Sequence, residues 1–302
     1  MSDRKPLDAF ATLVMVALCL CWGFQQISVK LIAADITPVM QMGLRSAIAA
    51  LVLGAFTLRR EGPAAFADGS LGAGLLVGAL FAAEFLCIAL GLVLTSASHM
   101  VVFLYSAPIF AALGLHLVRP DERLRPLQWA GVLLAFGGIA VSFLAGGGSV
   151  TRAMLAGDAL GLLAGLAWGL TTVAIRGSRL ADAPAVRTLF YQVAFAGVAL
   201  IAYAAARGQT AVHFTPTVVG HLAFQIVVIT LISYVIWFWL LRTYLASRLS
   251  ILSFLTPLFG VGFGVAVLHE RLEPSFVAGA LLVLGGIVLV SGSDLFRRRS
   301  AA

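Results

Sequence analysis

Three ionisable side chains, Arg45, Glu84 and His99, lie within or beside long apolar stretches of the sequence. Placing such a group inside an apolar span costs about 2.5–3.5 kcal/mol, so each is expected to face protein or water and to serve a function. Arg45 and Glu84 could form an ion pair that holds two helices together. Alternatively, Arg45 could bind a carboxylate through two hydrogen bonds, and Glu84 could take up a proton because desolvation disfavours its charged form. His99 is a second candidate for proton binding, unless it lies at a membrane interface without a role.

A stripe of one aromatic and two uncharged polar residues occurs twice in the chain. The two stripes are Trp22, Gln25 and Gln26, and Trp168, Thr171 and Thr172. Residues at i, i+3 and i+4 share one face of a helix, so each stripe presents a flat ring beside hydrogen-bonding groups. Such a face suits a cavity for a small amphipathic molecule, although Gln and Thr can equally join helices by hydrogen bonds. Tyr191, Tyr234 and Trp237 extend the candidate lining, with packing or interface anchoring as the alternative.

The composition identifies the setting of these residues. The 302-residue chain is 61% hydrophobic, contains only 20 Lys and Arg and 13 Asp and Glu, and has a mean hydropathy of +1.03. So few charged residues cannot cover the exterior of a soluble protein. Soluble enzymes, DNA-binding domains and disordered chains are therefore excluded, and no nucleic-acid partner is expected. The net charge of +7 comes mainly from arginines that flank apolar runs, where they act as topology signals.

Ten apolar runs are long enough to cross roughly 30 Å of hydrocarbon at about 1.5 Å per helical residue. They cover residues 10–30, 37–58, 71–94, 98–118, 126–145, 153–176, 185–206, 218–242, 247–268 and 275–295. Their connections are short, so no soluble domain is expected. The first run is longer than the apolar part of a signal peptide and has no clear cleavage site, and it is therefore expected to remain as a span.

The distribution of Lys and Arg predicts that both termini lie in the cytoplasm. With ten spans and the N-terminus inside, fifteen of the 20 Lys and Arg residues fall on the cytoplasmic side. Four, namely Lys30, Arg152, Arg207 and Arg271, fall on the other side. Cytoplasmic loops are enriched in these residues, and an odd number of spans would break the alternation.

The chain also contains an internal repeat. Trp22-Gly23 matches Trp168-Gly169, Pro108 matches Pro257, Glu122-Arg123-Leu124 matches Glu270-Arg271-Leu272, and Gly137-Gly138-Ile139 matches Gly285-Gly286-Ile287, at offsets of 146 to 149 residues. The matches define two units of five spans, residues 1–148 and 149–302. Because five is odd, the second unit starts on the opposite side of the membrane, which makes the repeats inverted, as in many transporters. Duplication for stability alone is the alternative.

The repeated residues resemble the EamA type of the drug/metabolite transporter superfamily. The resemblance rests on the two Trp-Gly pairs, Ser106-Ala107-Pro108 and Leu255-Thr256-Pro257, the Glu-Arg-Leu that follows each, and the two Gly-Gly-Ile motifs. Within that superfamily the whole chain is similar to the aromatic amino acid exporters of the YddG type. The resemblance implies ten helices, a central substrate cavity between the halves and a bacterial inner-membrane location. Substrates of such families include amino acids, other metabolites and drugs.

Pro108 and Pro257 lie at equivalent places inside the fourth and ninth predicted spans. Each removes a backbone hydrogen bond and is expected to bend its helix. A matched pair of bends could act as hinges for alternating access, or could simply shape the cavity.

No motif for catalysis or for a cofactor accompanies these features. The sequence has no phosphate-binding loop, no H-E-x-x-H and no G-x-S-x-G, which argues against ATP-driven transport and intramembrane hydrolysis. Cys19, Cys21 and Cys87 lack a metal-ligand pattern. We therefore predict an all-α membrane protein with ten transmembrane helices in two inverted five-helix repeats. It is expected to be a secondary transporter, not an enzyme, that exports small amphipathic metabolites, and aromatic amino acids in particular, by alternating access.

The expected partners are a small-molecule substrate and membrane lipid, without metal or cofactor; the oligomeric state stays open. Within transport, the alternatives are a broad multidrug exporter and a passive facilitator without ion coupling. Outside transport, they are an intramembrane enzyme and a scaffold or lipid-binding protein. The enzyme would need a convergent polar constellation, for which Arg45, Glu84 and His99 are the available material.

Overall fold

The structure is a computed structural model, and it describes residues 8–119, 123–144, 151–244, 249 and 252–299. Within these ranges every regular element is a helix, apart from an isolated antiparallel bridge between Ile36 and Val212. The longer helices are α1 (Ala9–Leu31), α2 (Pro38–Glu61), α3 (Leu71–Leu94), α4 (Ala97–Leu104), α5 (Ala107–Val118), α6 (Pro126–Leu144), α7 (Arg152–Arg176), α8 (Ala185–Ala206), α9 (Pro216–Ala223), η4 (Phe224–Ile232), α10 (Ser233–Thr243), α12 (Leu255–Leu268) and α13 (Pro274–Arg299). Two short 3-10 turns, η1 (Pro63–Phe66) and η3 (Arg179–Ala181), precede α3 and α8.

Seven helical stretches of 22 to 25 residues are long and apolar enough to cross a membrane. They are Ala9–Leu31, Pro38–Glu61, Leu71–Leu94, Ala97–Val118, Arg152–Arg176, Ala185–Ala206 and Pro216–Trp237. Three further apolar helices, Pro126–Ser142, Leu255–Leu268 and Pro274–Val290, are shorter. The protein is therefore an all-α, multi-pass membrane protein. Each of the ten predicted spans overlaps one of these stretches, while ten crossings of the membrane stay a prediction.

Polar residues in the connections set where the helices begin. A side-chain oxygen accepts a backbone N–H from the first turn at Asp8 before α1, Thr37 before α2, Ser96 before α4, Thr151 before α7 and Thr215 before α9. Such a cap satisfies one of the four N–H groups that a helix start leaves without an intrahelical partner, and it contributes about 1 kcal/mol. The local sequence thus fixes the first residue of these helices.

The predicted span 98–118 consists of two helices, because the helix breaks at Tyr105 and Ser106. Pro108 therefore lies in the first turn of α5, where its missing N–H removes no helical hydrogen bond. Pro257 is likewise the third residue of α12 and follows a turn. The bends expected inside these two spans take the form of breaks, with proline at the start of the next helix.

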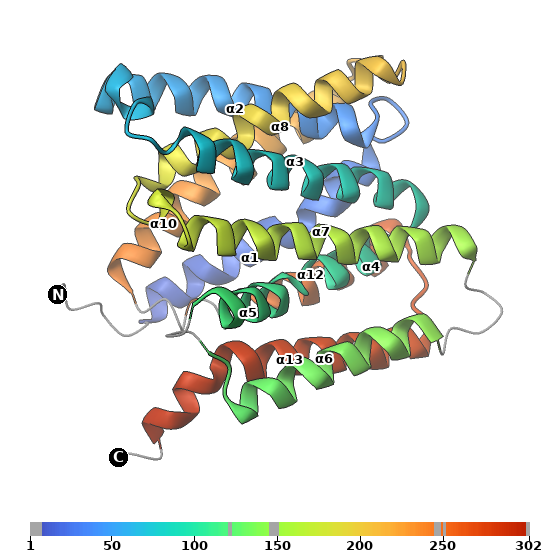
Figure 1. Cartoon of the computed structure of the whole chain (residues 1–302). Coiled ribbons are helices and arrows are strands. Elements are labelled where there is room, and N and C mark those ends of the chain that lie inside the picture. The colour runs from blue at the N-terminus through green and yellow to red at the C-terminus, as the bar shows by residue number, and fades with distance from the viewer. Residues whose placement is uncertain (1–7, 120–122, 145–150, 245–248, 250–251, 300–302) are drawn as a thin grey trace.

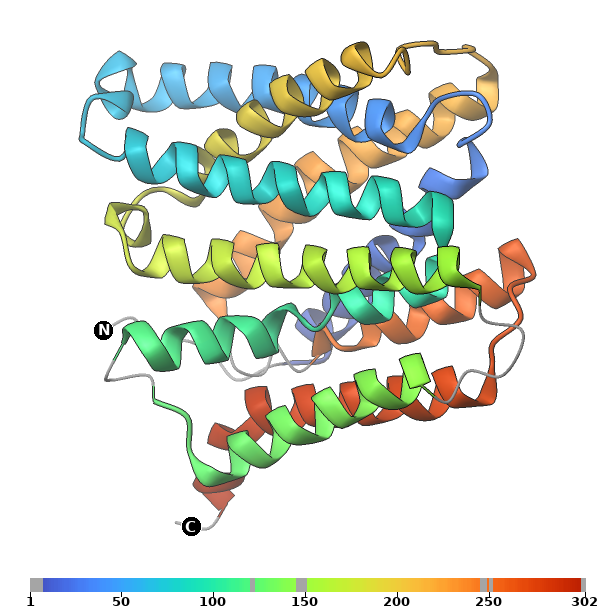
Figure 2. The same cartoon turned by 45° about the vertical axis from the view of Figure 1, so that its right-hand side comes forward.

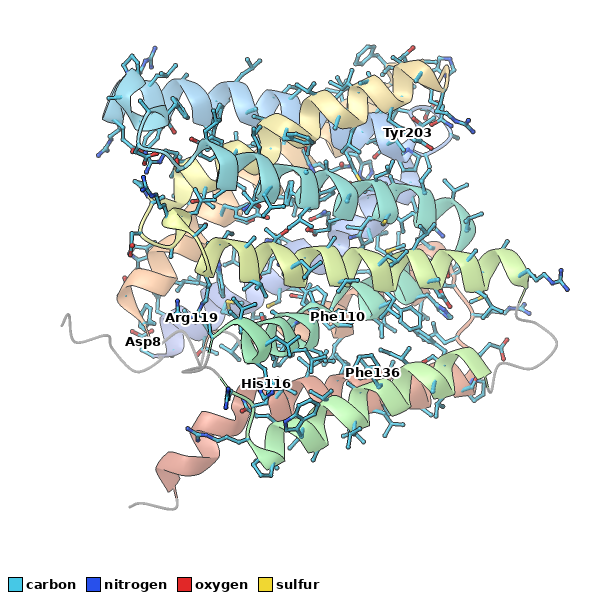
Figure 3. All side chains as sticks on the ribbon, in the orientation of Figure 1. Asp8, Phe110, His116, Arg119, Phe136 and Tyr203 are labelled. Carbon is cyan, nitrogen blue, oxygen red and sulfur yellow. The ribbon has the colours of Figure 1, made fainter. Side chains whose placement is uncertain are left out.

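Helices α6 and α13 form a close pair along one edge of the bundle (Figures 1 and 2). Glycines allow this approach, since a Cβ added at Gly138 would lie 2.6 Å from the Gly279 carbonyl oxygen and 2.7 Å from the Val283 nitrogen. Two aromatic pairs join α6 to α5, namely Phe110 with Phe136 and His116 with Trp129 (Figure 3). The pair is thus attached to the bundle by side-chain contacts with α5.

Apolar side chains cover the outside of the bundle, whereas polar side chains lie inside it. Leu51, Leu117 and Val198 are exposed, but Gln41 and Gln225 are buried. This distribution reverses that of a soluble domain and suits a hydrocarbon solvent, in which polar groups are stable only when protein surrounds them.

The bundle has two ends that differ in charge. The basic end holds the start of α1, the end of α2 and the end of α13 (Figure 1). Arg59 and Arg60 lie in the last turn of α2, and Arg179 lies in η3. The far end holds the connections 32–37, 95–96, 207–215 and 269–273.

Candidate functional site

A cavity, called the central cavity here, lies among α1, α2, α3, α8, η4 and α10. Its lining residues are Gln25, Arg45, Ser46, Phe81, Phe85, Leu189, Val193, Ile229, Thr230 and Tyr234. Both halves of the sequence contribute to it. The cavity has a volume of about 20 Å³, which is room for a water molecule. A larger ligand enters it only when the surrounding helices move apart.

Arg45 of α2 supplies the positive charge of the central cavity. Its side chain is buried, with 3% of the residue exposed, and its guanidinium carbon lies 4.5 Å from the centre of the Phe85 ring. Nη1 has no hydrogen-bond partner among the described residues. A buried cation with unused donors is costly until an anion binds it, and a guanidinium can hold a carboxylate through two parallel hydrogen bonds. The arrangement favours a ligand with a carboxylate and a flat apolar body.

Glu84 of α3 is close to Arg45, and the two charges interact electrostatically. Within the described part of the chain, however, no salt bridge joins them, so the ion pair considered from the sequence is not formed. Glu84 is 6% exposed, and its Oε2 has no hydrogen-bond partner there. A buried carboxyl with an unsatisfied oxygen is unfavourable as an anion. This geometry favours proton or ligand binding over a structural clip.

The first stripe divides between the cavity and its surroundings. Gln25 lines the central cavity, whereas the Trp22 Nε1 donates to Ser233 Oγ at 2.9 Å. The Trp22 and Trp237 rings meet edge to face at 5.7 Å and pack in an apolar cluster of α1, α10 and α12. Gln26 is buried, and its Oε1 has no partner among the described residues. Trp22 and Trp237 thus support the helices around the cavity, and Gln25 is the stripe residue that lines it.

The two tyrosines predicted as lining residues lie in different places. Tyr234 of α10 lines the central cavity. Tyr191 of α8 instead packs against Phe66 and Val77, and its hydroxyl lies 3.1 Å from Ser70 Oγ. The sequence could not separate the two, because each is an aromatic residue in an apolar span.

The second stripe borders another cavity, called the lateral cavity here. This cavity has a volume of about 440 Å³ among α5, α6, α7 and α13. Its lining residues are Ala107, Pro108, Ala111, Ala112, Leu115, Leu124, Gln128, Trp168, Thr172, Arg176 and Val290. The lining residues of α6, α7 and α13 belong to the halves of these helices nearer the basic end. The Trp168 ring contacts Tyr105 edge to face at 5.4 Å, and the Thr171 hydroxyl bonds back to its own helix at Ala167.

A buried network of uncharged polar groups, which sequence reasoning missed, lies between the central cavity and the far end. Gln225 Nε2 donates to Gln41 Oε1 at 3.1 Å and to Ser28 Oγ at 3.3 Å. Ser28 Oγ in turn lies 3.0 Å from His221 Nδ1. Gln225 is the second residue of the π-helical segment η4, a helix type that is rare and often found at functional sites. The spacing of these residues in the sequence does not reveal the network, because they lie on four elements, α1, α2, α9 and η4.

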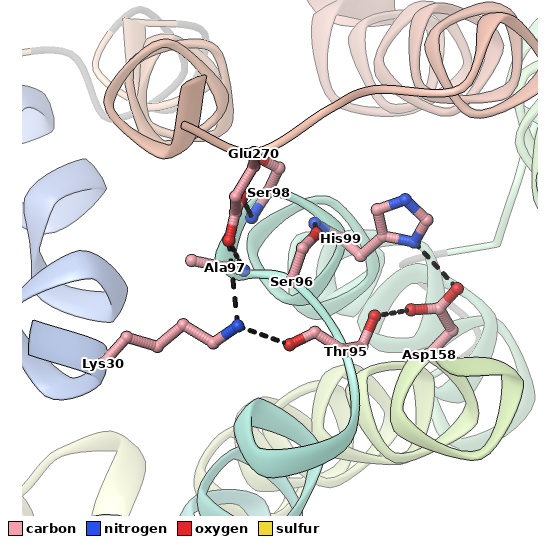
Figure 4. Close-up of polar contacts among 8 residues, drawn as sticks. All are labelled: Lys30, Thr95, Ser96, Ala97, Ser98, His99, Asp158 and Glu270. Atoms are coloured by element: carbon pink, nitrogen blue, oxygen red, sulfur yellow. Dashed lines mark hydrogen bonds and ion pairs between the residues drawn. The ribbon is translucent and has the colours of Figure 1, made fainter. Parts of the chain in front are cut away.

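His99 lies at the far end and is buried among other side chains, with 3% of the residue exposed. Its Nδ1 lies 2.8 Å from Oδ2 of Asp158 in α7, and Thr95 Oγ1 donates to the other oxygen of Asp158 at 2.5 Å (Figure 4). The imidazole stacks on the Phe276 ring, with centroids 3.7 Å apart. The contacts tie α4 to α7 and α13, and Asp158 is a functional candidate that the sequence reading did not select.

At the basic end, Arg187 joins α8 to the connection between α2 and α3. Its guanidinium lies 2.9 Å from Asp68 Oδ2 and 3.7 Å from Glu61 Oε2, and it donates to the Ala65 carbonyl oxygen. Hydrogen bonds from Ser70, together with the charge of Arg187, hold the pKa of the Asp68 carboxyl below its usual value. These contacts link the two halves of the sequence outside the membrane-spanning segments.

Comparison with known proteins gives two matches to one family. The EamA-like transporter family matches residues 9–144 and again residues 155–292. A probable amino-acid metabolite efflux pump of Salmonella typhimurium is 27% identical over 291 residues, which cover 93% of this chain and 94% of that protein. A protein of the same description from Escherichia coli is 28% identical with the same coverage. The uncharacterized transporter YoaV of Bacillus subtilis is 23% identical over 277 residues, or 91% of this chain and 94% of its own.

A solved crystal structure shares the fold. It has a TM-score of 0.64 at 18% sequence identity, and the similarity covers 93% of this chain and 97% of the other. The helices described above are therefore arranged as in a known protein along almost their whole length.

Proposed function

The chain belongs to the EamA-like transporter family, and from this premise we propose that it is a secondary transporter that exports small amphipathic metabolites by alternating access. Amino acids are the proposed substrate class, because two relatives that cover almost the whole chain are described as probable amino-acid metabolite efflux pumps. Within that class, the rings of Phe81 and Phe85 beside Arg45 favour aromatic side chains.

The observation that carries this proposal is the state of Arg45. It is a buried guanidinium with an unused donor, placed against an aromatic wall in a small cavity of about 20 Å³ that would widen around a substrate. A zwitterionic amino acid would bring a carboxylate for Arg45 and an ammonium group for Glu84. The ammonium group and a proton would then compete for Glu84, and such competition is what antiport of substrate against protons requires.

We propose further that ten helices in two inverted repeats span the inner membrane, with the basic end in the cytoplasm and lipid around the apolar exterior. The two family matches within one chain support a repeat, and the arginines at the basic end support the orientation. In this view the lateral cavity near the basic end and the contacts at the far end correspond to an inward-facing state, with Pro108 and Pro257 at the helix breaks as hinges.

The proposal is tested by flux into liposomes that contain only the purified protein. Labelled tryptophan, phenylalanine and alanine are measured in counterflow and with an imposed pH gradient, with unlabelled aromatic amino acids as competitors. We expect saturable counterflow that aromatic amino acids compete for. Arg45→Gln should reduce it by about tenfold or more, because the substrate carboxylate loses a buried charged partner.

The matched control is Arg207→Gln, which removes an exposed arginine at the end of α8 and should leave the flux unchanged. Absence of flux for every amino acid tested would reject the substrate class. Competition by unrelated organic cations would instead favour a multidrug exporter. A flux that does not depend on the imposed pH gradient would favour a passive facilitator.

A further inference from the structure

Glu270 holds the N-terminus of α4 at the far end (Figure 4). Its Oε1 accepts the Ala97 N–H at 2.7 Å, and its Oε2 accepts the Ser98 N–H at 3.0 Å and the Ser98 hydroxyl at 2.6 Å. Lys30 of α1 lies 3.8 Å from Oε1 and donates to the Thr95 carbonyl oxygen at 2.7 Å. Hydrogen bonds to an ionised carboxylate are stronger than neutral ones, and this carboxylate also faces the positive end of a helix dipole. It joins the connection after α12 to α4 and α1.

The backbone around Glu270 places this carboxylate against the N-terminus of α4. His269 ends α12 in the left-handed conformation with φ of 54°, which is uncommon for a residue other than glycine. The Glu270 N–H then bonds to the Gly264 carbonyl oxygen at 3.1 Å. A Cβ at Gly264 would lie 2.5 Å from Glu270 Oε2 and would collide with the Ser98 hydroxyl. The turn and the glycine together make room for the contact.

The helix that Glu270 holds is short and is bounded by breaks at both ends. Helix α4 has eight residues, with residues 95–96 separating it from α3 and residues 105–106 separating it from α5. Its neighbours α7 and α12 present glycines to it: a Cβ at Gly161 would lie 3.1 Å from Phe103, and a Cβ at Gly260 would lie 2.8 Å from Val101. Glycine faces allow helices to approach closely without interlocking side chains. Helix α4 thus has the features of an element that could move as a unit, and it is held by Glu270 at its N-terminus and by the contacts of His99 with Asp158 and Phe276.

We propose that α4 is the outer gate of the transporter and that Glu270 is its latch. The far end stays closed while the Glu270 carboxylate holds the α4 N-terminus, and it opens when the carboxylate withdraws. The contact joins residues from both halves of the sequence, as a gate between two repeats must. This inference rests on the proposed transport function. If Glu270 acted only as a helix cap, its loss would loosen the fold without changing which end is accessible.

The test is hydrogen–deuterium exchange of the full-length protein in lipid nanodiscs, without substrate. Glu270→Gln keeps the side-chain shape but loses the charge and one of the two acceptor oxygens. We expect amides within residues 97–104 to exchange about tenfold faster, as the gate opens. Peptides around the lateral cavity, residues 107–115 and 168–176, should exchange more slowly, because opening one end closes the other.

A second variant, Gly264→Ala, adds a methyl group that pushes the Glu270 carboxylate away from α4 and leaves every charge in place. It should therefore produce the same result as Glu270→Gln, with faster exchange at residues 97–104 and slower exchange around the lateral cavity. The matched control is Asp35→Asn, which removes a far-end carboxylate whose side chain makes no hydrogen bond or ion pair with the described residues. Faster exchange at both ends, or unchanged exchange of residues 97–104, would overturn the proposal that α4 is a gate held by Glu270. Because no substrate is used, a failed flux assay would reject the substrate class without altering this result.

Discussion

At the residue scale, the two charged side chains beside the central cavity leave different hydrogen-bonding groups unpaired. Arg45 has an aromatic ring at 4.5 Å and an unused donor, and Glu84 has an unsatisfied oxygen. Their mutual attraction lowers the cost of burying both, but Arg45 Nη1 and Glu84 Oε2 have no hydrogen-bond partner among the described residues. A ligand with one negative and one positive group would satisfy both at once, which is the chemical reason for proposing a zwitterion.

We predict that Glu84→Gln abolishes the response of transport to a pH gradient, because a glutamine amide, unlike a carboxyl group, does not take up and release a proton near neutral pH. Counterflow of labelled amino acid, which needs no net proton movement, should persist at a reduced level. The measurement is flux into liposomes at several imposed gradients. Asp35→Asn, a carboxylate removed from the far end, serves as the control, and an unchanged pH response in Glu84→Gln would remove this residue from the coupling mechanism.

Residue types and helical spacing identified part of the candidate site. Arg45 and Glu84 could be selected because charge is rare in apolar runs, and Gln25 and Tyr234 because they add polar groups to such runs. Asp158 is also a charged residue within an apolar run, but it was not selected as a candidate. Its importance comes from Thr95 and His99, which are remote in sequence and reach it only in the folded bundle.

At the element scale, the pair α6 and α13 depends on glycines that differ in their surroundings. Gly138 faces the α13 backbone, where an added Cβ would lie 2.6 Å from the Gly279 carbonyl oxygen, whereas nothing lies within 4 Å of a Cβ added at the neighbouring Gly137. Adjacent residues of one helix point in different directions, so the same substitution has opposite consequences at the two positions.

We predict that Gly138→Ala destabilises the protein by about 1–3 kcal/mol, because the added Cβ would strike two backbone atoms and the Leu282 Cβ, none of which can turn aside. Gly137→Ala should be neutral or stabilising by up to about 1 kcal/mol, because alanine favours the helix. Thermal unfolding in detergent compares the two variants with the parent protein. Equal effects at both positions would contradict the described packing of α6 against α13.

The helices themselves were largely predictable from hydropathy, since long apolar runs in a membrane have few alternatives to a helix. The breaks were not. The sequence 98–118 is uniformly apolar around Tyr105 and Ser106, and the fold breaks the helix where Gly165 of α7 packs against the Ser106 hydroxyl and the carbonyl oxygens of Phe103 and Leu104. The π-helical segment η4 likewise depends on the bond from Thr230 to the Gln225 carbonyl oxygen.

At the scale of the whole molecule, contacts between the two halves of the sequence occur at both ends. At the far end, the connection 32–37 pairs with the connection 207–215 through the bridge of Ile36 with Val212, and Glu270 and Asp158 reach α4. At the basic end, Arg187 binds the connection between α2 and α3. The proposed alternating access would require one set of contacts to yield while the other forms, so in that proposal the balance between the two ends sets the resting state.

The number of membrane crossings decides whether the repeats are inverted, and the three shorter helices make this testable. We predict that a reporter fused after Arg119 lies in the cytoplasm, one after Arg152 or His269 lies outside, and one at the C-terminus lies in the cytoplasm again. Alkaline phosphatase, active only outside, and green fluorescent protein, fluorescent only inside, should give complementary signals at every site. If Pro126–Ser142 did not cross the membrane, the fusion after Arg152 would report the cytoplasm, and the second unit would begin on the same side as the first. Two halves in the same orientation could not exchange inward-facing and outward-facing shapes by symmetry, so this one fusion separates the inverted-repeat mechanism from a simple duplication.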